Sequence, residues 1–152
     1  MQIETLRDVL HWTQEFHRHL SQCLTHCASE NIDERARMIL LYLSDHEKVL
    51  TKVISGFETS GDQRALNTWC YEYINHHPII QHEHCGAPFS ALDAEQVMDV
   101  IVDQHQQIIE LYRFIGSRAG AQSATELLDT IKTLEEHEVM RMVHSANRFR
   151  DM

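Results

Sequence analysis

The chain has 152 residues, a length that fits one domain spanning residues 1–152 with enough material to bury a substantial core. Its formal net charge of -10 and its 13 scattered basic residues argue against nucleic acid or an acidic membrane surface as a partner. No apolar run is long enough to span a bilayer, and the N-terminus lacks the pattern of a secretory signal, so we expect a cytoplasmic protein.

Histidine and cysteine are the informative residue types. The 12 histidines are well above ordinary usage, and histidine is the commonest protein metal ligand. The 4 cysteines are spaced too irregularly for a disulfide framework. Two of them, Cys23 and Cys27, share one helix face, and we interpret them as small buried thiols.

The first predicted helix covers about residues 3–28, where apolar residues recur with a period near 3.6. His17 lies on that apolar stripe. The next segment, SENID, carries Asn31 with Glu34 three residues later, a pattern that resembles a capping box. It predicts that the second helix begins near this point.

The second predicted helix, about 33–59, has a strong apolar stripe with one interruption. His46 and Glu47 occupy the place where the stripe would continue with apolar residues. A His and a Glu in that position indicate a polar feature inside the protein.

The insert 60–90 is too long for an ordinary loop between bundle helices, which takes about two to eight residues. It contains a predicted short helix, RALNTWCYEYIN, followed by the histidine-rich segment His76–Cys85. Its length favours either a crossover that links parallel helices or a flap over the bundle. The segment His76–Cys85 itself is interpreted as a polar loop, with a lid or a second metal site as the alternatives.

The third and fourth predicted helices cover about 91–118 and 124–149. His105 lies on the apolar stripe of the third. In the fourth, Glu135 and Glu138 are one turn apart and intrude on the apolar face, while His137 lies at its flank, so polar groups interrupt every predicted helix.

These interruptions fall near the midpoints of the four helices, and helix midpoints meet at one level in an up-and-down bundle. A carboxylate inside an apolar bundle costs several kcal/mol unless it is paired or coordinated, so a buried cluster needs a cation. Mixed histidine and carboxylate ligands suit iron, manganese or zinc better than calcium or magnesium. We therefore predict an all-α four-helix bundle with a metal site formed by His17, His46, Glu47, His105, Glu135, His137 and Glu138.

A short internal repeat relates the two halves of the chain. The first and third helices share an acidic-x-His element, and the second and fourth share acidic-His-Glu. The elements are Glu15-Phe16-His17, Asp103-Gln104-His105, Asp45-His46-Glu47 and Glu136-His137-Glu138. The repeat favours two helical hairpins related by an approximate twofold.

At these residues the chain resembles the ferritin-like and hemerythrin-like di-iron bundles, which hold a pair of metal ions with ligands from all four helices. Ferritin-like sites use one Glu on each of two helices and Glu-x-x-His on the other two. Here His17 and His105 replace the single Glu residues, and Leu43 and Leu134 precede His46 and His137 where that motif has Glu. Hemerythrin-like sites use His-x-x-x-Glu and His-x-x-x-His, whereas Leu50 and Ile109 follow His46 and His105 at that spacing.

The resemblance implies a di-iron centre, with manganese or zinc as alternatives, and chemistry on oxygen or peroxide, as in a di-iron oxidoreductase. Two other functions are compatible with the same residues. One is a haem-binding bundle in which two histidines from opposite helices act as axial ligands. The other is a metal-free interaction or dimerisation module, in which the chain forms a homodimer.

Overall fold

The computed structural model describes residues 3–70 and 88–150. They form one short helix, α3 (Gln63–Leu66), and the four long helices α1 (Leu6–Glu30), α2 (Glu34–Ser60), α5 (Ala94–Arg118) and α6 (Gln122–Arg150). The long helices begin and end within a few residues of the predicted positions. Within the described part of the chain, extended pairing is limited to one isolated bridge between Thr5 and Trp69. The predicted all-α bundle with a short extra helix is confirmed.

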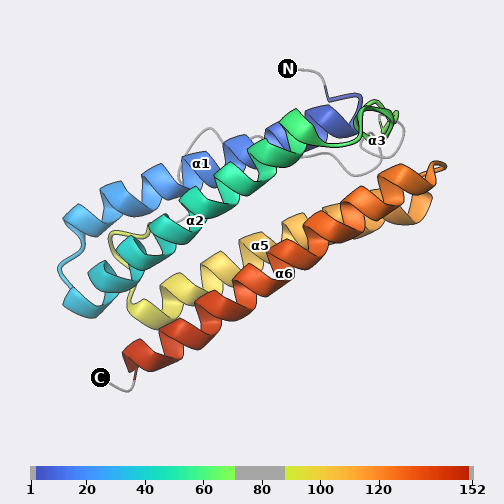
Figure 1. Ribbon diagram of the computed structural model, residues 1–152. Coiled ribbons are helices and arrows are strands. Elements are labelled where there is room, and N and C mark those ends of the chain that lie inside the picture. Colours follow the sequence, from blue (N-terminus) through green and yellow to red (C-terminus); the bar gives the residue numbers. More distant parts are fainter. Residues whose placement is uncertain (1–2, 71–87, 151–152) are drawn as a thin grey trace.

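The four long helices form two antiparallel hairpins that lie side by side (Figure 1). Helix α1 packs against α2, and α5 packs against α6. The two central helices in chain order, α2 and α5, run in the same direction (Figure 1). This direction matches the predicted crossover, because α5 begins at the opposite end of the bundle from the end of α2.

Hydrogen bonds at both ends of α1 anchor the two sides of this crossover. At the start of α1, the Leu6 N–H donates to the carbonyl oxygen of Thr68 (2.9 Å). At its other end, the buried side chain of Asn31 donates to the carbonyl oxygens of Phe89 (2.9 Å) and Leu92 (3.0 Å). Within RALNTWCYEYIN, which is predicted as one helix, the structure has α3 up to Leu66 and no helix over residues 67–70. Residues beyond Cys70, including His76–Cys85, lie outside the described residues.

The predicted cap of the second helix is corrected by this contact. Asp33 caps α2, because its carboxylate accepts from the N–H groups of Arg35 and Ala36. Asn31 instead ends α1, and its side-chain amide donates a hydrogen bond to the segment that leads into α5. A short polar side chain near a helix start is a capping candidate by sequence alone, and the tertiary partner decides its role.

The interior consists of two apolar clusters with a polar level between them. One cluster includes Leu10 and Ile108, and the other includes Leu24 and Ile101. On α1, α2 and α6, buried polar side chains separate the apolar residues of one cluster from those of the other. On α5, the buried His105 lies between Ile101 and Ile108, although Ile109 packs with Ile101. These side chains therefore meet halfway along the bundle.

The cysteines and the hydropathy of the helices can also be compared with the sequence predictions. Cys23 is disulfide-bonded, which corrects its interpretation as a thiol, whereas Cys27 and Cys70 are free and buried. Among the described residues, no helix has both the length and the hydropathy that crossing a bilayer requires.

Candidate metal centre

Four side chains, one from each long helix, close a ring of contacts at the polar level. We call His17, Glu47, His105 and Glu135 the buried ring. His17 contacts Glu47 through Nδ1 and Glu135 through Nε2, both at 2.6 Å. His105 contacts Glu47 through Nε2 at 2.5 Å and Glu135 through Nδ1 at 3.2 Å. Each carboxylate uses one oxygen for each imidazole, so every nitrogen and oxygen of the ring has a partner.

The helices direct these side chains inward because each lies on the apolar stripe of its own helix. His17 and His105 stand between apolar residues that face the two core clusters, and all four side chains of the buried ring are 0% exposed. The two imidazoles lie face to face, with ring centroids 5.3 Å apart and an angle of 25° between planes. Packing on both sides therefore fixes the level and the orientation of the ring.

Charge within the buried ring shifts the pKa of all four groups. Burial by itself lowers the pKa of His17 and His105, but the neighbouring carboxylates outweigh this effect and raise these values to about 9 and about 10. Burial by itself raises the pKa of Glu47 and Glu135, but the two imidazolium rings outweigh it. The pKa of Glu47 is lowered, and that of Glu135 falls to about 2. Without a cation, the ring is two imidazolium ions paired with two carboxylates.

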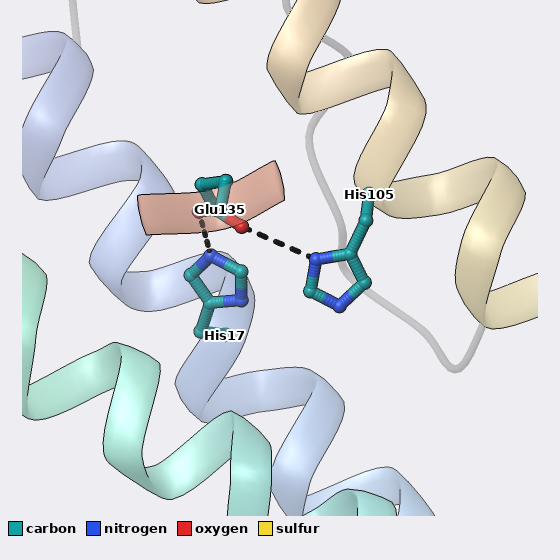
Figure 2. Close-up of side chains that lie close together, drawn as sticks. All are labelled: His17, His105 and Glu135. Carbon is teal, nitrogen blue, oxygen red and sulfur yellow. Dashed lines mark hydrogen bonds and ion pairs between the residues drawn. The ribbon is translucent and has the colours of Figure 1, made fainter. Parts of the chain in front are cut away.

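Three of these residues offer a compact set of metal ligands. One donor atom each from His17, His105 and Glu135 lie within 4.8 Å of one another, and all three residues are buried. Figure 2 shows the Glu135 carboxylate reaching both imidazoles from α6. Two imidazole nitrogens and a carboxylate oxygen suit a transition metal, and a site of this composition is known for non-haem iron. The residues present therefore fit a metal ion of the class predicted from the sequence.

Comparison with known proteins gives one structural relative. A crystal structure from Thermotoga maritima, described as a candidate ferritin-like diiron-carboxylate protein, superposes with a TM-score of 0.59. The alignment covers 94% of this chain and 95% of that chain at 12% sequence identity. The fold is ferritin-like. No family model matches the sequence, and no curated protein matches it.

Tyr112 has a buried hydroxyl that interacts electrostatically with Glu135 of the ligand set. Tyr112 is on α5, two turns beyond His105 and therefore on the same helix face. Its side chain is 1% exposed, and its hydroxyl lies near Thr13 without a hydrogen bond of ordinary geometry. Burial, followed by the negative charge of Glu135, raises the pKa of Tyr112 well above its usual value. A neutral donor is thus held in the core near the charged carboxylate.

Two predicted ligands form a separate contact outside the ring. His46 contacts Glu138 through Nδ1 at 2.8 Å, and we call these two residues the rim pair. Their side chains are 20% and 11% exposed, and Arg141 also donates to Glu138 at 2.9 Å. The ring of Tyr42 lies 4.4 Å from that of His46. The structure therefore brings the rim pair together, but with each other and an arginine rather than with the ring.

The remaining predicted ligand, His137, is not brought to the site. Its side chain is exposed on the outer face of α6. Successive residues of an α-helix are about 100° apart, so a residue two positions after the inward-facing Glu135 points about 200° away from it. The prediction placed His137 at the flank of the apolar face, and this difference in rotation removes it from the ligand set that we propose.

The internal repeat is present, with the first and third helices matched as predicted and the second and fourth matched in a different register. The second hairpin begins 88 residues after the first at both of its helices (94 − 6 and 122 − 34). His17 and Glu47 are 30 residues apart, and so are His105 and Glu135. The structural equivalent of Glu47 is therefore Glu135 and not Glu138, which the sequence elements had matched. This equal His-to-Glu spacing was the signal in the sequence that identifies the ring.

The orientation of the two imidazoles does not suit a haem group between them. Axial ligands direct a nitrogen lone pair, which lies in the imidazole plane, at a shared iron from opposite sides. The stacked rings of His17 and His105 instead present their faces to each other, and their nitrogens point at carboxylates. The geometry of the ring favours an ion that a carboxylate also binds.

Proposed function

We propose that this chain is a metal-binding protein that holds a transition-metal ion, with iron first and manganese or zinc as alternatives, at the buried ring. The observation that carries the proposal is the closed set of contacts among two histidines and two glutamates with no solvent exposure. Several kcal/mol are needed to bury each ionised group, and apolar side chains of similar volume would avoid that cost. A metal site explains why the four helices keep these groups in the core.

The described residues would hold the ion with His17, His105 and Glu135, and Glu47 contacts both histidines from the other side. Iron bound there would supply one-electron redox chemistry with oxygen or peroxide. Three protein ligands leave coordination positions open for such a small molecule.

The ferritin-like relative supports the choice of iron, since it is described as a candidate diiron-carboxylate protein. The activity we propose is accordingly that of an iron-dependent oxidoreductase acting on oxygen or peroxide. The sequence identity of 12% between the two chains supports only a common fold. The proposed chemistry therefore rests on the residues of the buried ring.

One observation favours a second function, a metal-free structural module. Every nitrogen and oxygen of the buried ring already has a partner within the ring, so the charges are balanced without an ion. In that case the ring would serve to fix the register of the two hairpins. Elemental analysis separates the two functions.

The test is the metal content of protein purified without chelators and without a nickel column. We expect one or more equivalents of transition metal in the wild-type chain and loss of it in His105→Ala. The matched control is His46→Ala, which removes a histidine from the rim pair and is expected to keep the metal. Wild-type protein that is folded, free of metal and unable to take up iron, manganese or zinc would contradict the proposed function.

A further inference from the structure

We propose that the buried ring holds a single ion, bound on the side of Glu135, and that Glu47 is a positioning residue that accepts an N–H bond from each ligating imidazole. This inference rests on the proposed metal-binding function and specifies how many ions bind and which carboxylate binds them. It departs from the di-iron centre that the sequence resemblance implies.

The imidazole nitrogens lie on two sides of the ring. Each ring presents one nitrogen to Glu47 and the other to Glu135. A neutral imidazole has one lone pair and one N–H, and an ion takes the lone pair. Both rings can therefore bind an ion only from the same side, and both N–H groups then point to the carboxylate on the other side.

The spacing of the donor atoms indicates which side holds the ion. Donor atoms of His17, His105 and Glu135 form the compact set within 4.8 Å, and Glu47 does not belong to it. The contacts of Glu47 with His17 (2.6 Å) and His105 (2.5 Å) use one oxygen each. This geometry suits two N–H groups donating to one carboxylate, which is the usual way that a protein orients ligating histidines. The longest contact of the ring, 3.2 Å, lies on the Glu135 side.

The charge of the ring bears on the number of ions. Two carboxylates neutralise one divalent ion, and the histidines bind it as neutral ligands. With the imidazoles neutral, a second divalent ion in the same fully buried ring would leave two positive charges uncompensated by any side chain of the ring. The alternative, in which both nitrogens of each imidazole bind an ion, would require both imidazoles to give up their last N–H proton and become anions. The ring therefore matches one ion.

The decisive experiment determines which nitrogen of each histidine binds zinc, a diamagnetic probe. Zinc is titrated into metal-free, ¹⁵N-labelled wild-type protein, and two-bond ¹H–¹⁵N correlation spectra identify the coordinated nitrogen in each ring. We expect saturation at one zinc per chain, with His17 bound through Nε2 and His105 through Nδ1. Coordination of His17 through Nδ1, or saturation at two ions in the ring, would overturn the inference.

A matched pair of variants tests the roles of the carboxylates. Glu47→Gln and Glu135→Gln each remove one charge from the same ring while keeping the shape of the side chain. Loss of an orienting partner typically weakens metal binding by about 10–100-fold, so we expect that range for Glu47→Gln with one zinc still bound. We expect more than about 100-fold weakening for Glu135→Gln, because a ligand itself is lost. Equal weakening in both variants would contradict the assignment, whereas no zinc binding by wild-type protein would contradict the proposed function.

Discussion

The buried ring and the rim pair contain the same kinds of side chain but in different surroundings. In the ring, each imidazole is held between two carboxylates, and water has no access. In the rim pair, one imidazole meets one carboxylate, both are partly exposed, and Arg141 shares the carboxylate. His46 and Glu47 are neighbours in the sequence, yet they belong to different sites. Burial and the number of partners, more than residue type, distinguish the proposed metal site from an ion pair.

The largest difference between these regions is expected when one partner is removed. Glu47→Leu leaves two N–H groups of the ring buried without an acceptor, and breaking a buried ion pair in this way costs about 3–5 kcal/mol of unfolding free energy. Glu138→Leu is the matched control at the rim, where His46 and Arg141 both lose an acceptor but remain in reach of water. The measurement is urea denaturation of both variants with a chelator present. Equal losses would show that the ring is no more dependent on its partners than the rim.

The sequence was sufficient to predict the bundle, because the apolar period of about 3.6 is long and regular in all four helices. It also placed polar groups at the midpoint of each helix. It could not determine the rotation of each helix about its axis, and adjacent residues differ by about 100°. That rotation sends Glu135 into the ring and His137 to solvent, although both lie near the apolar stripe. The role of Asn31 was also beyond prediction, because its partners, Phe89 and Leu92, are distant in the sequence.

The stability of the metal-free protein should depend on pH through the ring. The pKa of His17 is raised from 6.5 to about 9, and that of His105 to about 10. The stability that these histidines contribute is therefore fully present below pH 6.5 and is lost as the pH rises through their raised pKa values. The pKa of Glu135 is lowered from 4.5 to about 2, so its contribution is present above pH 4.5 and is lost as the pH falls towards 2. The ring therefore stabilises the metal-free chain most between pH 4.5 and 6.5.

Between about pH 7.5 and 8.5, the folded ring retains about two protons that the unfolded chain has released. The unfolding free energy should then fall by about 2.7 kcal/mol per pH unit because of these two groups. The measurement is urea denaturation across this range in chelator, and the control is a variant with leucine at all four ring positions. The difference between the two proteins isolates the ring from the other histidines. A difference that does not change with pH would contradict the doubly protonated rings.

Replacing all four residues of the ring tests whether the ring contributes to stability or serves to bind a metal ion. Substituting an entire buried ionic group by apolar residues of similar volume is often neutral or stabilising by about 1–4 kcal/mol. We expect the variant with four leucines to unfold at higher urea than metal-free wild-type protein at pH 7.5, and to bind no zinc. If it instead loses cooperative unfolding, the ring is required for folding, and the metal-free structural function gains support.

The smallest effect is expected at the rim pair. His46→Gln removes the imidazole that faces Glu138, but Arg141 remains as a partner for that carboxylate. Partly exposed ion pairs contribute about 0–1 kcal/mol, and salt screens them, so the loss should be within this range and should shrink in 1 M salt. Zinc should still bind with one equivalent, because no ligand of the ring has changed. A loss as large as that of Glu47→Leu, or a loss of zinc, would mean that the rim pair and the ring act as one site, because the two share no hydrogen bond or ion pair among the described residues.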